Sequence, residues 1–116
     1  MVNEGLPLYV VARIERRFPE LMNMTVGILG MSFKAGSDDT RSSLSYKLKR
    51  ILRFKAQQVL THDPHVTTDP DLSDLSEVLE ASDLLVIGTP HSEYRDLRTE
   101  TPVVDIWNLL ESGVRI

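Results

Sequence analysis

No cysteine occurs among the 116 residues, which excludes disulfides, thiolate metal sites and a cysteine nucleophile from this sequence. No apolar run approaches the roughly 18 residues of a membrane span, so we expect no membrane partner. The N-terminal segment lacks the basic, apolar and small-residue order of a signal peptide, which favours a cytoplasmic location. Because the net charge is −4 at pH 7, phosphate neutralisation is disfavoured and we expect no nucleic-acid partner.

The chain does contain short apolar runs that alternate with amphipathic stretches. Apolar runs that end in glycine, proline or aspartate are typical of buried parallel strands. Stretches whose apolar residues recur three or four positions apart indicate helices. The predicted helices cover residues 6–18, 43–55 and 71–82, with a helical turn at 91–97, and the predicted strands cover residues 25–30, 57–63, 83–90 and 102–108.

This order of elements predicts an α/β protein. The expected fold is a Rossmann-like, three-layer α/β/α domain with a parallel sheet, preceded by an N-terminal helix. The strand order stays open at this point. Ligands of such folds bind where the strands end, which directs attention to residues 31–43, 62–65, 88–92 and 105–108.

The loop FKAGSDDTRSS is longer than a connection between a strand and a helix requires. Lys34 offers a mobile positive charge and Arg41 offers a planar fork, and both suit phosphate or carboxylate. Phe33 adds a flat apolar surface beside them. The sequence leaves two interpretations open, namely an anion-binding loop and a surface loop whose charges compensate each other.

Two adjacent aspartates in the same loop have several possible roles. Asp38 and Asp39 are suited to capping the next helix, to holding Arg41, or to bonding ribose hydroxyls. They also suggest a phosphoacceptor receiver domain. That class places its acidic pair at the end of the first strand, whereas this pair lies eight residues beyond Gly30, which argues against it.

The glycines around the first strand do not form the dinucleotide fingerprint G-x-G-x-x-G. Gly27 and Gly30 are present, but Leu29 occupies the middle position and would obstruct the approach of a pyrophosphate. Tight packing at the strand end is the alternative role for both glycines. Asp63 lies where Rossmann proteins place a ribose-binding acid, and a turn role for the Asp-Pro pair is an equal alternative.

The three histidines do not show the spacing of a metal site. His62, His65 and His91 lack carboxylates or thiols at ligand spacing, so we expect no bound metal. Ser92 and Glu93 resemble the N-cap of a helix more than a catalytic constellation. The sequence therefore offers no candidate catalytic residue.

Longer motifs carry a resemblance to a known family. VGILGMSFKAGSDDTRSS, a strand ending in HDP, and the segments DLLVIGTPHSEYRDL and VVDIWN together resemble the C-terminal domain of the UDP-glucose/GDP-mannose dehydrogenase family. The most specific part is the pattern G-x-x-F-K-x-x-(S/T)-x-D-x-R-x-S, which runs from Gly30 to Ser43. VNEGLPLYVV resembles the end of the helix that joins the family's central domain to this one. Residues 1–22 are therefore expected to end that linking helix, and residues 23–116 to form the nucleotide-sugar-binding domain.

The resemblance implies a role in an NAD-dependent 6-dehydrogenase. Enzymes of this family oxidise the C6 hydroxyl of a nucleotide sugar to a carboxylate in two steps, through a thioester on a cysteine. The NAD-binding domain and the cysteine belong to other parts of the family's chain, so this domain is expected to be inactive alone. The implied partners are a UDP- or GDP-hexose, the N-terminal and central domains, and a second copy in a homodimer of the full-length enzyme.

The resemblance also implies roles for individual residues. Phe33 and Lys34 are expected to contact the nucleotide sugar, and Arg41 to reach toward NAD. Many members carry an arginine shortly after the aspartate of the last strand, where this chain has Trp107 and Asn108. A tryptophan can stack on a base but cannot neutralise a phosphate. Trp107 and Asn108 complete the expected substrate-binding residues.

A different class of function remains as the alternative interpretation. The chain would then be a stand-alone Rossmann-like interaction or regulatory module without catalysis. Such a module is expected to expose an apolar patch and to have no pocket beside the loop at 33–43.

Overall fold

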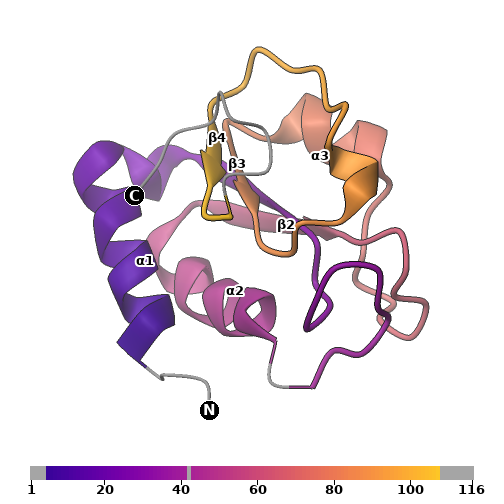
Figure 1. Ribbon diagram of the computed structural model, residues 1–116. Helices are drawn as coiled ribbons and strands as arrows, with labels where there is room; N and C mark the ends of the chain where they lie inside the picture. The colour runs from indigo at the N-terminus through magenta and orange to yellow at the C-terminus, as the bar shows by residue number, and fades with distance from the viewer. Residues whose placement is uncertain (1–4, 42, 108–116) are drawn as a thin grey trace.

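The computed structural model describes residues 5–41 and 43–107 (Figure 1). Its centre is a parallel four-stranded sheet with the strand order β2-β1-β3-β4. The strands are β1 (Thr25–Leu29), β2 (Gln58–His62), β3 (Leu84–Ile87) and β4 (Val103–Asp105). The helices are α1 (Gly5–Arg17), α2 (Leu44–Lys55) and α3 (Leu75–Ala81), with the short 3-10 helices η1 (Leu21–Asn23) and η2 (Ser92–Tyr94).

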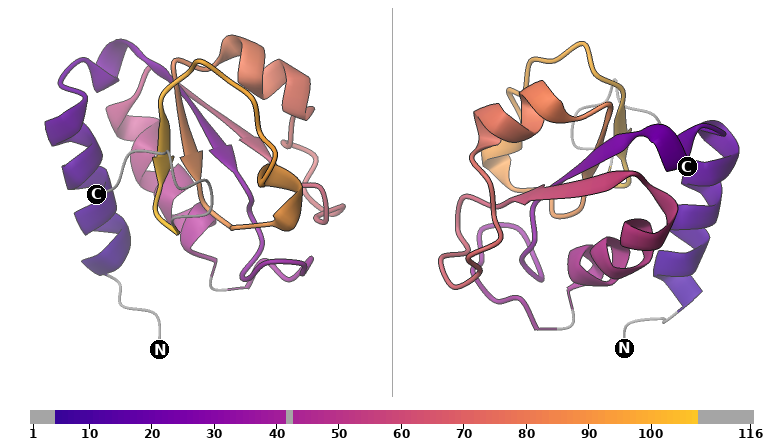
Figure 2. Two further views of the ribbon diagram at one scale, coloured as in Figure 1. Left: turned by 45° about the horizontal axis from the view of Figure 1, so that its top comes forward. Right: turned by 180° about the vertical axis from the view of Figure 1, so that it is seen from behind.

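Two helices cover one face of the sheet and one helix covers the other, as both views in Figure 2 show. Successive side chains of a strand point to opposite faces, so each buried strand contributes to two cores. The core below α1 and α2 contains Val10, Ile14, Val26, Ile28, Leu48, Leu52, Leu84, Val86 and Val104. The core below α3 and η2 contains Leu29, Val78, Leu85, Ile87, Tyr94 and Val103. The predicted three-layer α/β/α class is therefore confirmed.

The predicted elements are all found, but several are shorter than the sequence pattern indicated. The strand expected at 83–90 ends at Ile87, because the N–H groups of Gly88 and Thr89 both donate to the Leu29 carbonyl. The strand expected at 102–108 ends at Asp105. The helix expected within 71–82 begins at Leu75, directly after its N-cap residue Asp74. The apolar runs predicted both strands at the correct places in the chain, but they did not predict the residue at which each strand ends.

The strand order places the switch point of the sheet at the carboxyl ends of β1 and β3. The chain leaves β1 through α2 to reach β2 on one side, and then returns through α3 to β3 on the other side. Strand order reverses between β1 and β3, which is the switch point where open α/β sheets bind ligands. The segments after β1, β2 and β3 therefore meet at one end of the sheet.

Two glycines permit close packing around β1. Gly30 has a φ of +93°, and a Cβ there would lie 2.5 Å from the Thr89 carbonyl oxygen. A Cβ on Gly27 would lie 2.5 Å from the side chain of Val78 on α3. These contacts support the packing role for both glycines, because any larger residue would push a loop or a helix away from the strand.

Candidate functional site

Three loops converge at the carboxyl end of the sheet, and one buried carboxylate joins them. Asp63 follows β2, and its Oδ2 accepts the N–H groups of Met31 at 2.6 Å and Ser32 at 3.0 Å, just after β1. Its Oδ1 accepts the N–H groups of His65 at 2.7 Å and Val66 at 3.1 Å. The turn role considered for Asp63 is therefore present, and the same side chain also fixes the neighbouring loop.

The charge of Asp63 is stabilised although its side chain is buried. Burial alone would raise the pKa of Asp63, but the N–H groups of Met31 and His65 and the ring of His91 lower it by more, so the pKa lies below its ordinary value. His91 Nε2 lies 2.8 Å from Oδ2. With five donors around it, Asp63 is held as a carboxylate and not as a neutral acid.

His91, which follows β3, is completely buried and its protonation pattern follows from its partners. Its Nδ1 lies 3.0 Å from the backbone nitrogen of Gly36, whose N–H can only donate. Nδ1 must therefore accept, and in the neutral ring Nε2 carries the proton. That proton points toward the Asp63 carboxylate and lies near the hydroxyl of Ser32, 3.0 Å from Nε2.

Ser32 forms the fixed base of the long loop. Its hydroxyl donates to the Lys34 carbonyl at 2.8 Å. Its own carbonyl accepts the Thr89 hydroxyl at 2.7 Å and the Ser43 hydroxyl at 3.4 Å. The loop after β1 is thus tied to the loop after β3 and to the start of α2.

The tip of the loop is exposed, in contrast to its base. Phe33 is 52% exposed, and Lys34 is also exposed. The N–H of Phe33 donates to the Asp39 carbonyl at 2.5 Å, and the backbone turns at Gly36, whose φ is +73°. Hydrogen bonds therefore close the loop while two of its side chains face solvent.

Arg41 is held by its neighbour in the loop. Its Nε and its terminal nitrogen donate to the two oxygens of Asp39 at 3.0 and 2.9 Å. These bonds to Arg41 lower the pKa of Asp39 to about 2. Of the roles considered for the aspartates, holding Arg41 is the one that Asp39 performs. Capping is performed by Ser43, whose hydroxyl accepts the N–H of Ser45 at 3.1 Å.

The comparisons with known proteins agree with this architecture. Residues 27–112 match the family model described as "UDP-glucose/GDP-mannose dehydrogenase family, UDP binding domain". The chain belongs to this family.

Relatives in this dehydrogenase family are several times longer than this chain. The UDP-N-acetyl-D-mannosamine dehydrogenase of Pyrococcus horikoshii is 31% identical over 104 residues, which cover 86% of this chain and 24% of the relative. The GDP-mannose 6-dehydrogenase of Pseudomonas aeruginosa is 35% identical over 97 residues, which cover 66% of this chain and 22% of the relative. The chain spans about a quarter of the length of the curated relatives it matches.

Solved structures of the family share the fold. The UDP-glucose dehydrogenase of Pyrobaculum islandicum superposes with a TM-score of 0.81 at 26% identity, covering 97% of this chain and 29% of that one. A ternary complex of the GDP-mannose dehydrogenase from Pseudomonas aeruginosa superposes with a TM-score of 0.65 at 27% identity, over 83% and 27% of the two chains. The likeness includes α1, since the first match covers almost the whole chain.

The expected substrate-binding residues of this family domain are only partly described by the structure. Phe33 and Lys34 lie together at the loop tip. Trp107 is 47% exposed, and its indole Nε1–H donates to the Gly88 carbonyl at 3.0 Å, which fixes the ring beside the end of β3. Asn108 lies outside the described residues. The fold therefore brings Trp107 to the same end of the sheet as the loop.

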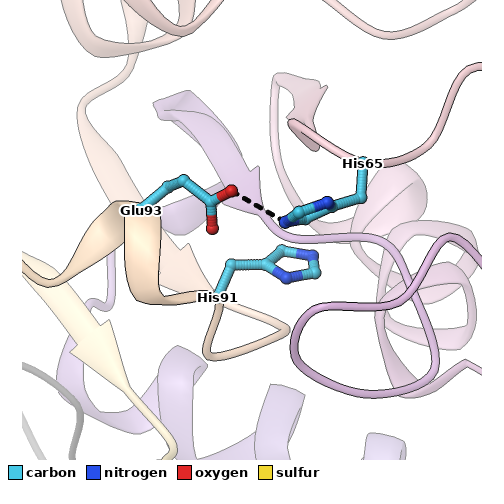
Figure 3. A group of neighbouring side chains, drawn as sticks. All are labelled: His65, His91 and Glu93. Atoms are coloured by element: carbon cyan, nitrogen blue, oxygen red, sulfur yellow. Dashed lines mark ion pairs between the residues drawn. The ribbon is translucent and has the colours of Figure 1, made fainter.

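The structure also forms a histidine and carboxylate cluster that sequence spacing missed (Figure 3). His65 Nε2 lies 2.8 Å from Glu93 Oε2, and the ring centroids of His65 and His91 are 4.6 Å apart. Sequence spacing offered no carboxylate ligand for the histidines, whereas the fold brings Glu93 of η2 to His65. The predicted cap is wrong, because His91 precedes η2 and no side-chain bond caps it.

This cluster does not have the free ligands of a metal centre. The ligand atoms of His65, His91 and Glu93 lie within 4.8 Å of one another. However, a metal needs an unprotonated nitrogen with a free lone pair, and both ring nitrogens of His91 are already used. Two ligands remain, fewer than the three or four of zinc sites. The absence of a bound metal stays a prediction.

A partly apolar groove that bears on the alternative function lies away from the loop. Phe18, Leu21, Met22 and Phe54 line this groove beside the C-terminal ends of α1 and α2, at the end of the sheet where β1 begins. Met22 is 71% exposed and Phe54 is 89% exposed. Within residues 5–41 and 43–107, no helix is long and apolar enough to cross a membrane.

Proposed function

We propose that the chain is the nucleotide-sugar-binding domain of an NAD-dependent dehydrogenase that oxidises the CH-OH group of a UDP- or GDP-hexose to a carboxylate. The proposal includes the other domains of such an enzyme, which supply the main NAD site and the catalytic cysteine. Residues 1–22 would then end the helix that leads from the central domain, and residues 23–116 form the binding domain. The isolated chain is inactive in this proposal.

The observation that carries the proposal is the loop after β1. It presents an exposed aromatic ring and an exposed ammonium group, those of Phe33 and Lys34, at the switch point of the sheet. A nucleotide sugar offers a base and a hexose to an apolar surface and a diphosphate to a cation. The family model for a UDP binding domain covers this loop, and this supports the same ligand class.

Three further residues have proposed roles, and two of them, Trp107 and Arg41, lie at the same end of the sheet. Trp107 is anchored through its indole N–H and has almost half of its surface free, so it can stack on a base. Arg41 has a side chain that is 89% exposed, and its planar fork is oriented by Asp39. We assign Arg41 to the phosphates of NAD bound by the neighbouring domain. Asn108 is retained as a proposed substrate contact.

A nuclear magnetic resonance titration of the 116-residue chain with UDP-glucose tests the proposal. We expect amide shift changes centred on residues 33–41 and on the indole N–H of Trp107. A parallel titration with GDP-mannose ranks the two nucleotides. Shifts confined to other residues, or no shifts at millimolar ligand, contradict the proposal.

A pair of lysine variants sharpens this test. Lys34→Ala should weaken UDP-glucose binding at least about tenfold, because a charge-assisted bond to phosphate contributes about 1.5–3 kcal/mol. Lys55→Ala is the matched control, since Lys55 lies on α2 and pairs with Glu15 at 3.7 Å, away from the loop. Equal affinities of the two variants would exclude Lys34 from the binding site.

A further inference from the structure

We propose that His91 is a positioning residue, which holds the loop of Phe33 and Lys34 in the conformation that binds the nucleotide sugar. This inference rests on the proposed function of that loop. It concerns a side chain that does not itself reach the ligand, because the ring is completely buried. His91 acts through the backbone of the loop.

The His91 ring contacts the loop on both sides of its exposed residues. Ser32, just before Phe33, places its hydroxyl 3.0 Å from Nε2. Gly36, two residues after Lys34, donates its N–H to Nδ1 at 3.0 Å. The segment between these two contacts carries both exposed side chains, so the ring fixes the ends of the part of the loop that faces the ligand.

The carboxylate of Asp63 determines which nitrogen is available to Gly36. Asp63 Oδ2 lies 2.8 Å from Nε2 and favours the ring form with its proton on that nitrogen. Nδ1 is then left with a lone pair, which is the acceptor that the Gly36 N–H needs. A chain of hydrogen bonds thus runs from the loop after β2 through the loop after β3 to the loop after β1.

The two nitrogens of the ring have separable roles, and two substitutions separate them. In His91→Asn the amide oxygen can occupy the position of Nδ1, so the variant keeps an acceptor for Gly36 and loses the donor to Asp63. In His91→Gln the amide nitrogen can reach the position of Nε2, so the variant keeps the donor to Asp63 and loses the acceptor. If the ring only filled space, the two variants would not differ in whether they keep the hydrogen bond to Gly36 or the one to Asp63.

The experiment compares both variants with the unmodified 116-residue chain, and uses UDP as the probe. In His91→Gln we expect the amide exchange of Gly36 to accelerate about tenfold and the Kd for UDP to rise roughly fivefold, since one hydrogen bond is lost. In His91→Asn we expect Gly36 to remain protected and the Kd to stay within about twofold, with a lower unfolding midpoint than in His91→Gln.

Other results overturn the inference. If UDP affinity follows the unfolding midpoints of the two variants, His91 has only a structural role. If ring nitrogen resonances of the unmodified chain show the proton on Nδ1, the acceptor for Gly36 is absent and the inference fails. This last measurement needs no variant, so it decides the question even where a variant does not fold.

The proposed function and this inference fail in distinguishable ways. If the unmodified chain binds neither UDP nor GDP, the proposed function is wrong. The exchange rate of Gly36 is measured without nucleotide, and it still shows whether His91 holds the loop. Unchanged exchange in His91→Gln overturns the inference even where UDP binds normally.

Discussion

The base and the tip of the loop after β1 differ in almost every physical property. At the base, Ser32 is buried and its N–H, hydroxyl and carbonyl are all hydrogen-bonded. At the tip, Phe33 and Lys34 face solvent, and the charges of Asp39 and Arg41 are paired at the surface. This comparison shows that the buried hydrogen bonds at the base stabilise the loop, while the exposed side chains at the tip are available to contact a ligand.

The physical reason is the different cost of leaving a polar group without a partner. At the buried base a lost hydrogen bond exposes a donor or an acceptor to an apolar surrounding, which is expensive. At the exposed tip water replaces any lost partner. Substitutions at the two places should therefore differ strongly in their effect on folding.

The largest expected effect is that of Asp63→Asn at the base. The amide group has one acceptor oxygen and no charge, so at least two of the backbone N–H groups that Asp63 binds lose their partner. We expect the free energy of unfolding to fall by about 3–5 kcal/mol, as measured when buried pairs are broken. Urea unfolding monitored by circular dichroism at pH 7 gives this value.

The matched control lies at the tip of the same loop. Asp38→Asn makes the same chemical change at an exposed position and should leave the unfolding midpoint unchanged. If the free energy of unfolding falls by the same amount in both variants, the inference that the base stabilises the loop and the tip does not is wrong. A loss below about 1 kcal/mol for Asp63→Asn would also contradict it.

A smaller effect is expected from acid, which protonates the same carboxylate. The pKa of Asp63 in the folded chain lies below its ordinary value of 3.8, so the carboxylate stabilises the folded state fully above that pH. This stability is lost as the pH falls through the folded pKa. The difference in unfolding free energy between the unmodified chain and Asp63→Asn should therefore be constant near neutral pH and narrow below about pH 4. A difference that stays constant down to about pH 2 contradicts this prediction.

The smallest effect on stability is expected at the tip, from Arg41→Ala. The ion pair with Asp39 is exposed, and such pairs contribute little to folding. The unfolding midpoint should be unchanged, but the pKa of Asp39 should rise from about 2 toward its ordinary value because the bonds from Arg41 are lost. Carboxyl carbon resonances followed through an acid titration measure this pKa. Lys34→Ala is the control and should shift it less, since Lys34 acts on Asp39 only through its charge.

Much of the site was predictable from the sequence, because part of it is local. An apolar run located β1, the helical recurrence of apolar residues located α2, and the loop between them stood out by its length and its charged residues. Arg41 and its partner Asp39 are two residues apart, so their pairing needs no tertiary contact. The sequence pattern predicted the ends of β3 and β4 too far along the chain. For β3 the reason is tertiary, because the N–H groups of Gly88 and Thr89 bond to β1 and end the strand.

The role of His91 could not be predicted from the sequence. Its partners are Asp63 after β2, and Ser32 and Gly36 after β1. The segments HDP and TPH place polar residues directly after β2 and β3. Because the carboxyl ends of parallel strands lie at one edge of the sheet, this position indicated that the polar residues lie at the same end. Their contact depends on β1 lying between β2 and β3, and apolar runs carry no information on strand order.

The sequence by itself determined the elements, the α/β class and the exposed chemistry of the tip, because helix periodicity, apolar runs and turn residues act over a few positions. The motif from Gly30 to Ser43 also indicated the family. Only the tertiary structure decided which polar groups are buried together at the base. The reason is physical: the charge of Asp63 is stable in the interior only where three strand ends, distant in the chain, bring it enough donors.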